Sequence, residues 1–403
     1  MKILGGAYRE VCRDPARDDF YGSGLRAAVA ISRATVPLEL VTAATVEEQD
    51  LIQLLATSFG FTVSCQPRPS SVCFTYSTPL HVPQLSPREL PRLQLHATDK
   101  TVLAFGMVEA DWSIAGTSLI IDPQGLTQLN ARTRWSGPRT ALVANRSEIL
   151  SISNAQGSSH AAAQELLARY KLDAVVAKRG AMGAFVVDAA GVCDIGVFPV
   201  KPIYPIGTGD VFSSVFACCW GELGLPAAEA ARRASLATAV WASRGPLQVL
   251  RESGEVVNPD LLEERHVLKA PTIYLAGPFF SVAQRWLVDT LRESLSSLGA
   301  RVISPLHDVG VGPPSSIAQA DLEQLSAADG VLAILDGLDS GTLFEVGYAR
   351  ACGIPVVGFA SECCQTDLAM VIGTGVTIHS DLCTAAYHSI WHAQSDSKPA
   401  TAT

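Results

Sequence analysis

The sequence predicts an α/β protein built from two doubly wound domains, each with a parallel sheet that helices cover on both faces. Short apolar runs alternate with amphipathic helical stretches, first over residues 1–250 and again over residues 271–393. Such alternation is typical of parallel sheets with crossover helices. A chain of 403 residues also exceeds the size of one ordinary core. Residues 251–270, charged and weakly periodic, are therefore expected to link the domains, and residues 394–403 to form a flexible tail.

The composition indicates a well-buried protein whose partners are small molecules. Hydrophobic residues make up 48% of the chain and charged residues 17%, and the formal net charge is −9. Nucleic acids and anionic membrane surfaces require a basic face, so we expect neither as a partner. No apolar run reaches the length of a membrane span, and the N-terminal stretch turns polar too early for a signal peptide. Ten cysteines without a C-x-x-C spacing indicate reduced thiols and a cytoplasmic protein.

In the first domain, strands are expected where apolar runs end in glycine or a polar residue. These runs are residues 2–7, 101–107, 118–123 and 140–145, and residues 173–188 indicate two strands around a glycine turn. Helices are expected at residues 24–34, 159–170 and 226–245, the last bounded by Pro226 and Gly245. Residues 61–95 are rich in proline and serine, and they predict either a lid or an antiparallel excursion.

The second domain has a clearer pattern of four strands separated by helices. The expected strands are residues 272–277, 301–305, 330–336 and 354–360, and the expected helices are residues 281–298, 315–327 and 341–352. In a compact doubly wound fold of this kind, ligands bind at the carboxyl ends of the strands.

The stretch Gly207-Thr208-Gly209-Asp210, followed by an apolar helix, is the first candidate site. A glycine turn at a helix entrance frees backbone amides that, with the helix dipole, can hold an anion. A carboxylate beside an anion site is repulsive unless it has a chemical role. We therefore interpret Asp210 as the base of a phosphoryl transfer, with residues 207–209 as the anion hole. The alternative is a strand-to-helix turn in which Asp210 is an N-cap worth about 1 kcal/mol.

Four segments in order resemble the ribokinase-like (PfkB) carbohydrate and nucleoside kinase family over about residues 1–250. They are residues 21–32, 145–148 (Asn-Arg-Ser-Glu), 178–184 (Lys-Arg-Gly-Ala-Met-Gly-Ala) and the turn at 207–210. The resemblance implies ATP and Mg²⁺ as cofactors, with Asn145 and Glu148 placing the metal largely through water. It also implies that Lys178, Gly180 and Gly183 lie near the nucleotide. Alternatively, the second segment is a helix start and the third a plain hairpin turn.

The substrate-binding positions depart from the pattern of this family. Gly22 and Gly24 keep its glycines, but Arg26 stands where the family has asparagine, which suggests a substrate with an extra acceptor or negative charge. Glu10 takes the place of an aspartate that contacts sugar hydroxyls. Tyr204-Pro205-Ile206 replaces the usual Asp-Thr-Thr before the catalytic turn.

The second candidate site surrounds Glu345, which follows a glycine-containing helix entrance. The helix dipole is expected to keep this carboxylate ionised and nucleophilic. Cleavage of an N-glycosidic bond passes through an oxocarbenium-like carbon that a carboxylate can attack. A second carboxyl must exchange a proton with the departing base, and Asp321 is the candidate. Alternatively, both are ordinary solvated helix residues.

Residues 274–280, 304–308, 321–329 and 339–349 resemble the nucleoside 2-deoxyribosyltransferase family in order and spacing. The resemblance implies that Glu345 forms a glycosyl-enzyme intermediate and that Asp321 assists at the base. Tyr274, Gly277 and Phe279 would line the base pocket. Asp339 would lie near the 5′ end of the sugar, where its charge suits a free hydroxyl better than a phosphate unless Ser340 compensates.

The combined expectation is a bifunctional enzyme of nucleoside and sugar metabolism that acts on small molecules and forms a homo-oligomer. One half phosphorylates a sugar or nucleoside hydroxyl, and the other cleaves or exchanges an N-glycosidic bond. The alternative is a nucleotide sensor whose kinase-like half binds without turnover and regulates the glycosidase half or a partner.

Overall fold

The structure is a computed structural model that describes residues 1–34, 37–153, 157–257, 259, 262–267, 269–308, 314–364 and 366–395. Its contacts divide the chain into two compact units, and each is described separately. The first comprises Met1–Arg179, Gly183–Val200 and Tyr204–His266, and the second comprises Gly180–Met182, Lys201–Ile203 and the chain from Val267. Most of the expected linker therefore groups with the first unit, to which the bridges Leu250–Val256 and Val197–Arg265 attach it. Beyond residue 395 the expected tail lies outside the described residues.

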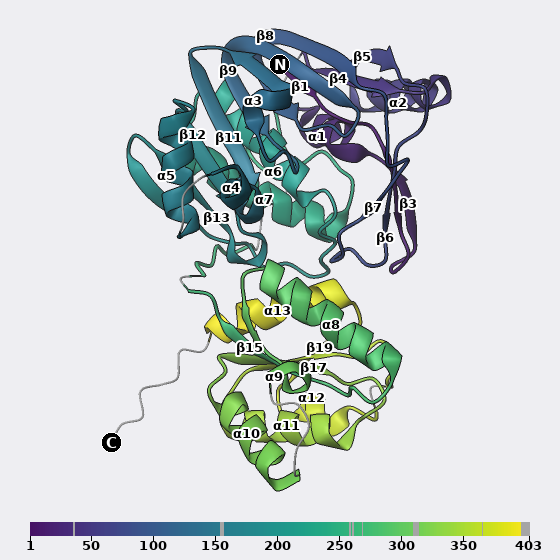
Figure 1. The fold of residues 1–403 in the computed structure, drawn as a ribbon, viewed down its shortest axis with the longest axis vertical. Helices are drawn as coiled ribbons and strands as arrows, with labels where there is room; N and C mark the ends of the chain where they lie inside the picture. The colour runs from purple at the N-terminus through teal and green to yellow at the C-terminus, as the bar shows by residue number, and fades with distance from the viewer. Residues whose placement is uncertain are drawn as a thin grey trace. The chain divides into compact units, whose positions relative to one another are not determined.

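A large, mostly parallel sheet forms the centre of the first unit (Figure 1). Its order is β14-β13-β12-β11-β9-β8-β1-β4-β5, with β10 beside β9. The strands are β1 (Lys2–Leu4), β4 (Glu39–Ala44), β5 (Thr62–Pro67), β8 (Leu93–Phe105), β9 (Ala110–Asp122), β10 (Thr133–Ser136), β11 (Arg139–Asn145), β12 (Ala174–Lys178), β13 (Ala184–Asp188) and β14 (Gly191–Ile195). Only the pairs β12–β13 and β13–β14 are antiparallel. The predicted buried strands are confirmed.

Strands β8 and β9 pair in parallel along their whole length, although only four residues connect them. A parallel connection ordinarily needs a dozen residues or more, so each strand must itself turn back. The pairing agrees, because the first half of β9 pairs with β10 whereas its second half pairs with β11. Gly116 of β9 pairs with Asp99 of β8 where the strands turn. A Cβ on Gly116 would lie 2.1 Å from the carbonyl oxygen of Asp99, so the two strands can lie this close only with glycine at that position. The second half of β9 lies between β8 and β11, so the end of β9 is part of the central sheet.

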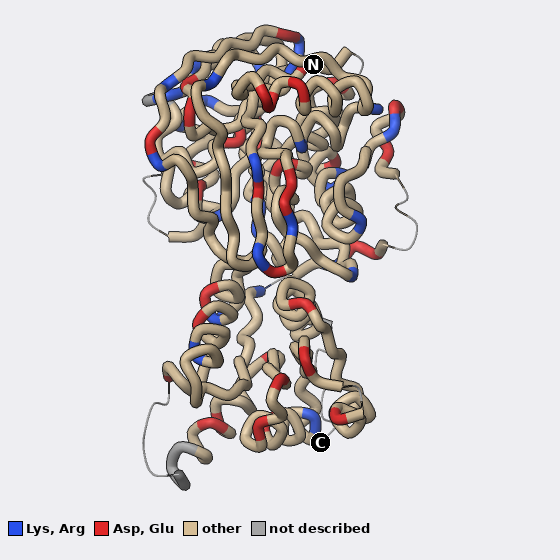
Figure 2. Tube along the Cα trace, turned by 90° about the vertical axis from the view of Figure 1, so that its right-hand side faces the viewer, with Lys and Arg blue, Asp and Glu red and all other residues tan. Residues whose placement is uncertain are grey.

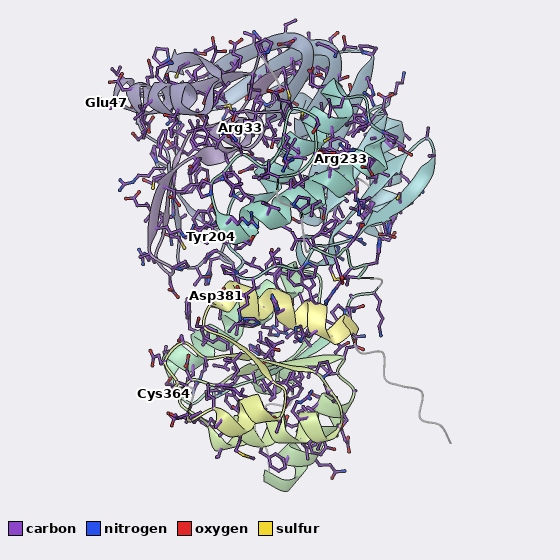
Figure 3. All side chains as sticks on the ribbon, turned by 180° about the vertical axis from the view of Figure 1, so that it is seen from behind. Arg33, Glu47, Tyr204, Arg233, Cys364 and Asp381 are labelled. Atoms are coloured by element: carbon purple, nitrogen blue, oxygen red, sulfur yellow. The ribbon has the colours of Figure 1, made fainter. Side chains whose placement is uncertain are left out.

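Helices cover both faces of this sheet, as the sequence predicts for a doubly wound fold. Helices α1 (Gly22–Ile31), α2 (Val46–Phe59), α6 (Thr208–Ala217) and α7 (Ala227–Arg244) contribute to one apolar cluster, together with the π-helical turn at Cys218–Glu222. Helices α4 (Arg146–Ile152) and α5 (Ser159–Arg169) contribute to the other, as does the short α3 (Leu129–Arg132). Figure 3 shows that side chains fill the space between the helices and the sheet. In that view Arg233 marks α7, and Tyr204 marks the segment that leads to α6.

A separate small sheet consists of β3 (Arg17–Phe20), β2 (Arg9–Cys12), β6 (Cys73–Tyr76) and β7 (Gln84–Ser86), in that order. Strands β6 and β7 come from the segment expected to form a lid or excursion, and they pair antiparallel. Strand β2 carries Glu10 into this sheet.

The second unit contains a sheet of five parallel strands in the order β16-β15-β17-β18-β19. They are β15 (Thr272–Ala276), β16 (Arg301–Ile303), β17 (Gly330–Ile334), β18 (Val356–Phe359) and β19 (Thr377–His379), the last absent from the sequence prediction. Numbered along the unit, this is the flavodoxin-like order 2-1-3-4-5, whose ligands bind where the first and third strands adjoin. The helices are α8 (Val282–Ser297), α9 (Pro305–Asp308), α10 (Pro314–Ser326), α11 (Ser340–Ala351), α12 (Ala369–Gly373) and α13 (Leu382–Ser395).

Acidic residues outnumber basic residues, 39 to 30, over the chain. Figure 2 shows both signs along the trace of the first unit, whereas acidic residues predominate along the second. Within the part of the chain that the structure describes, no helix is both long and apolar enough to cross a membrane.

Candidate active sites

The turn before α6 has the conformation that its glycines predict. Gly207 lies in the left-handed region at φ 78°, and α6 begins at Thr208. The Thr208 amide and hydroxyl both donate to the carbonyl of Pro205, at 3.1 and 2.8 Å. Among the described residues, the amides of Gly207 and Gly209 donate to no acceptor. Two of the three expected anion-hole residues therefore have open amides, whereas the Thr208 amide is engaged within the turn.

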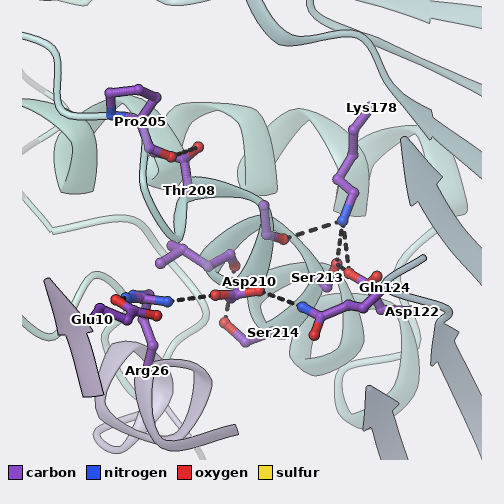
Figure 4. A network of polar contacts seen from close by, with 12 residues as sticks. Glu10, Arg26, Asp122, Gln124, Lys178, Pro205, Thr208, Asp210, Ser213 and Ser214 are labelled. Carbon is purple, nitrogen blue, oxygen red and sulfur yellow. Dashed lines mark hydrogen bonds and ion pairs between the residues drawn. The ribbon is translucent and has the colours of Figure 1, made fainter. Parts of the chain in front are cut away.

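Asp210 lies in the first turn of α6, and its side chain is held from two directions (Figure 4). Arg26 Nη1 donates to its Oδ2 at 2.6 Å, and Gln124 Nε2 donates to its Oδ1 at 2.7 Å. The residue is 8% exposed. Burial raises the pKa of Asp210 to about 6, and the charges of Asp122 and Glu10 act in the same direction against Arg26. A carboxyl with this pKa suits proton transfer near neutral pH.

Arg26, on α1, bridges two carboxylates. Its other terminal nitrogen donates to Glu10 of the small sheet, and the residue is 4% exposed. Burial alone would lower the pKa of Arg26, but the charges of Glu10 and Asp210 outweigh it and raise that pKa. The guanidinium also covers the turn before α6, because a Cβ on Gly207 would lie 2.1 Å from Arg26 Nε. The structure therefore brings together three residues that the sequence analysis named separately.

Lys178 ends β12 and reaches the start of α6. Its ammonium lies 2.6 Å from Asp122 Oδ2, 3.2 Å from Ser213 Oγ and 3.4 Å from the carbonyl of Gly209. Burial would lower the pKa of Lys178, but the charges of Asp122 and Glu148 outweigh it and raise that pKa, so the cation persists. Figure 4 shows this cluster beside Asp210.

Sequence reasoning missed Asp122, Gln124 and Ser213. Asp122 had a signal, because it ends a buried parallel strand at the edge where ligands gather. Gln124 and Ser213 had none, since their positions depend on how the β9 loop meets α6.

Asn145 and Glu148 form a reciprocal capping box at the start of α4. The Asn145 Oδ1 accepts the Glu148 amide at 2.8 Å, and Glu148 Oε2 accepts the Asn145 amide at 2.8 Å. Glu148 Oε1 accepts the Gly125 amide at 2.9 Å. The described residues contain no group of three or more His, Cys, Asp or Glu arranged to hold a metal ion. This donor set fits Mg²⁺ only through water, by the remaining lone pairs of Glu148.

Several glycines that were predicted to bind ligands are also required by the backbone. A Cβ on Gly24 would lie 2.5 Å from the Gly5 carbonyl carbon, so Gly24 allows α1 to approach β1. Gly22 has φ +65° and lies against Gly6 and Tyr8. Gly183 has φ +78°, where a Cβ would meet the Ile195 carbonyl. A side chain at these three positions would strain the backbone, and their predicted place at a ligand stays a prediction.

Gly180 has φ +56° and begins the turn Gly180–Met182. This turn belongs to the second compact unit. Its expected place near a nucleotide stays a prediction.

In the second unit, Glu345 and Tyr274 are joined by a short hydrogen bond. Tyr274, fully buried in β15, donates its hydroxyl to Glu345 Oε1 at 2.6 Å. Burial raises the pKa of Glu345 to about 7 against the lowering effect of the Tyr274 hydrogen bond, and the charges of Asp321 and Asp339 act in the same direction as burial. The expectation that the helix dipole keeps Glu345 ionised is therefore wrong. Glu345 lies beyond the first turn of α11, where the dipole has faded and desolvation dominates.

Asp321 lies on α10, which packs beside α11. Its charge raises the pKa of both Glu345 and Tyr274, which places the three groups in one electrostatic cluster. Its own pKa is raised by burial. Among the described residues, Asp321 Oδ1 is a buried oxygen without a hydrogen-bond partner. A buried acceptor left open is costly unless a ligand completes it.

Asp339 is the N-cap of α11, since its Oδ2 accepts the amide and the hydroxyl of Thr342 at 2.8 and 2.9 Å. Ser340 follows as an exposed first helical residue. After β15, Gly277 approaches Ile334 so closely that a Cβ would lie 2.8 Å from its Cδ1. Phe279 stacks on Phe280 with ring centroids 5.5 Å apart. The other oxygen of Asp339, Oδ1, accepts neither of these bonds, and its predicted contact with a sugar stays a prediction.

Comparison with family models identifies both halves of the chain. Residues 273–382 match the model of the nucleoside 2-deoxyribosyltransferase family, and residues 115–249 match that of the pfkB family of carbohydrate kinases. The chain therefore contains one segment that matches each family model, as the resemblances predicted. The pfkB match begins after Glu10 and Arg26, so these two departures from the family pattern lie outside it, whereas the departure at residues 204–206 lies within it.

Individual proteins give weaker likenesses. An uncharacterized protein of Schizosaccharomyces pombe is 30% identical over 109 residues, which is 23% of this chain and 52% of that protein. The chain thus spans about half the length of this curated relative. A putative ribokinase II from E. coli is 15% identical with a TM-score of 0.46, covering 61% of this chain and 94% of the other. Ribokinase from Thermotoga maritima is 17% identical with a TM-score of 0.45, covering 63% and 95%.

Proposed function

We propose that the second unit cleaves or exchanges the N-glycosidic bond of a nucleoside, with Glu345 as the nucleophile. One observation carries this: a buried tyrosine hydroxyl lies 2.6 Å from Glu345, with the unpartnered carboxyl of Asp321 in the same cluster. Tyr274 lies on β15, next to β17, at the adjoining strands where this sheet order binds ligands.

The proposed reaction uses each of these groups. The Glu345 carboxylate attacks the anomeric carbon and forms a glycosyl-enzyme ester, while the base leaves with the electron pair of the broken C–N bond. Asp321, whose pKa is raised, donates a proton to the leaving base. Water or a second base then attacks the anomeric carbon and releases Glu345. Tyr274 orients the carboxylate throughout.

For the first unit we propose phosphoryl transfer from ATP to a sugar or nucleoside hydroxyl. Asp210 accepts the hydroxyl proton, and the open amides of Gly207 and Gly209 receive the phosphoryl oxygens. Lys178 offsets negative charge at the same helix start. Mg²⁺, when bound with the nucleotide, would supply charge neutralisation, held through water by Glu148. A solved ribokinase II structure from E. coli is described as a complex with ATP and Mg²⁺, in keeping with these cofactors.

Because the two domains share one chain, we propose that their substrates are linked. We also propose that the protein acts in the cytoplasm, as a homo-oligomer, on nucleosides and sugars. A second candidate function is a nucleotide sensor whose kinase-like half does not turn over. The ion pair between Arg26 and Asp210 favours it, because the guanidinium occupies a carboxylate oxygen that a substrate hydroxyl would need.

Two matched variants test the assignment. Asp210→Asn and Glu345→Gln preserve the size of each side chain and remove one carboxylate. Incubation with ATP and pooled nucleosides, followed by mass spectrometry, should show base release lost only in Glu345→Gln and phosphorylated product lost only in Asp210→Asn. Base release that persists in Glu345→Gln would contradict the glycosidase proposal. Tight ATP binding without phosphorylated product in any variant would favour the sensor.

A further inference from the structure

The contacts of Arg26 bear on which acceptor the first unit takes. Its guanidinium occupies the space between the small sheet and the catalytic turn, with one edge on Glu10 and the other on Asp210. It lies against Gly207, whose amide is one of the two open donors. In this arrangement both oxygens of Asp210 already accept hydrogen bonds, from Arg26 and from Gln124. A neutral acceptor hydroxyl would therefore compete with a charged, buried donor.

Releasing Asp210 requires something that takes its place on Arg26. Removing one partner of a buried ion pair leaves an uncompensated charge, which is strongly unfavourable. A hydroxyl group cannot replace a carboxylate as a partner for guanidinium, whereas a carboxylate or a phosphate monoester can, in the bidentate geometry that arginine favours. Glu10 can stay on the far edge of the guanidinium while the near edge turns to the ligand.

Other groups near Arg26 suit an anion in this position. Tyr76 of the small sheet is half-buried, and the charges of Glu10, Arg26 and Asp210 all act on its hydroxyl. Tyr76 is therefore a neutral donor within electrostatic range of the guanidinium. The ring of Tyr21 lies 5.5 Å from the Arg26 guanidinium carbon. Lys178 interacts electrostatically with Asp210, which limits the repulsion between a ligand anion and the released carboxylate.

We propose that Arg26 is a latch that selects an anionic acceptor, namely a sugar derivative carrying a carboxylate or a phosphate monoester. The acceptor anion takes Nη1 of Arg26 from Asp210, and the released Asp210 accepts the proton of the acceptor hydroxyl. The hydroxyl oxygen forms the new P–O bond to the γ-phosphoryl group, and the bond to the β-phosphate oxygen breaks, so that ADP leaves with its electron pair. This proposal rests on the kinase function proposed for the first unit.

The test compares D-ribose, D-ribonate and D-ribose 5-phosphate as acceptors for the full chain, Arg26→Asn and Arg26→Lys. ADP formation gives kcat/KM, and titration calorimetry without nucleotide gives acceptor binding. At least one of the two acids should exceed ribose by about tenfold or more, and the preferred acid identifies the anion. Arg26→Asn should lose this preference and accept ribose better, while Arg26→Lys, which keeps the charge, should retain part of it.

Several outcomes would overturn the latch. Equal use of ribose and both acids by the unaltered chain, or an acid preference that survives in Arg26→Asn, would each do so. Failure of the kinase function itself is recognised separately, as ADP formation that Asp210→Asn leaves unchanged or that is absent throughout. In that case the calorimetric titrations decide: acids that bind the unaltered chain no better than Arg26→Asn overturn the proposal, and acids that bind it about tenfold better support the anion site. Arg26→Lys guards against an Asn variant that fails to fold.

Discussion

At the level of single residues, both candidate sites centre on a carboxyl group whose pKa burial has raised. Asp210 and Glu345 reach pKa values of about 6 and about 7 despite donors that act in the opposite direction. In each case a second carboxylate adds to the effect, Asp122 for the former and Asp321 for the latter. Desolvation is thus the larger force at both positions, and each donor sets orientation.

The hydrogen bond from Tyr274 should tune the acidity of Glu345. Tyr274→Phe removes a donor that lowers the pKa of Glu345, so the ionised nucleophile should form only at higher pH. Base release near neutral pH should fall by about 10- to 100-fold, the usual range for a hydrogen bond to a charged group, and the rising limb of the pH–rate profile should move upward. The control is Tyr348→Phe, which removes a tyrosine hydroxyl from α11, the helix that carries Glu345. An unchanged profile in Tyr274→Phe would remove Tyr274 from the site.

Glu345 should also limit stability in a pH-dependent way. Because its folded pKa is raised, the native state holds a proton that the unfolded chain releases, so the free energy of unfolding falls as pH rises from 4.5 to about 7. The difference between these values corresponds to at most about 3 kcal/mol. Glu345→Gln should therefore be more stable than the unaltered chain at about pH 8 and similar at about pH 4, measured by urea unfolding. A stability gain that is larger in acid would contradict the raised pKa.

At the level of elements, helix starts do different work in the two units. The start of α6 leaves two amides open beside Asp210, whereas the start of α4 is closed by the capping box of Asn145 and Glu148. Helix α11 is capped by Asp339, and its candidate nucleophile lies further along the helix. Of these helix starts, α6 is the one suited to receive an anion, since open amides distinguish it from a capped helix.

The entry of α1 should tolerate no side chain at Gly24. A Cβ there would lie 2.5 Å from the Gly5 carbonyl carbon, which belongs to backbone that cannot move aside easily. Gly24→Ala should cost about 1–3 kcal/mol of stability in urea unfolding followed by circular dichroism. Gly347 on α11 is the matched helical control, because nothing lies within 4 Å of its Cβ position. Gly347→Ala should be neutral or stabilising by up to about 1 kcal/mol, and equal effects of the two would refute the packing argument.

At the level of the whole molecule, each unit carries its own sheet, core and candidate site. The groups that shift the pKa of Asp210 all belong to the first unit, and those that shift the pKa of Glu345 all belong to the second. The proposed activities of the two units would therefore need no energetic coupling, whereas a sensor would.

Nucleotide should accordingly leave the glycosidase rate unchanged. Base release measured with and without a saturating non-hydrolysable ATP analogue should agree, since an allosteric coupling would change it by about 5-fold or more. Asp210→Asn, which keeps the fold of the first unit, should behave in the same way. A several-fold change that the analogue causes in the unaltered chain would instead favour the sensor.

The sequence by itself determined the fold class, many of the buried strands and the turns that carry Asp210 and Glu345, because periodicity and glycine turns are local properties. It did not mark β4 or β19. It also indicated both families. Tertiary structure decided which charges meet: Arg26 and Asp210 are 184 residues apart, and their pairing depends on the strand order that brings α1 beside α6. It also decided that Glu345 is protonated more readily than its helix position suggests. Desolvation comes from surrounding elements, which no local pattern encodes.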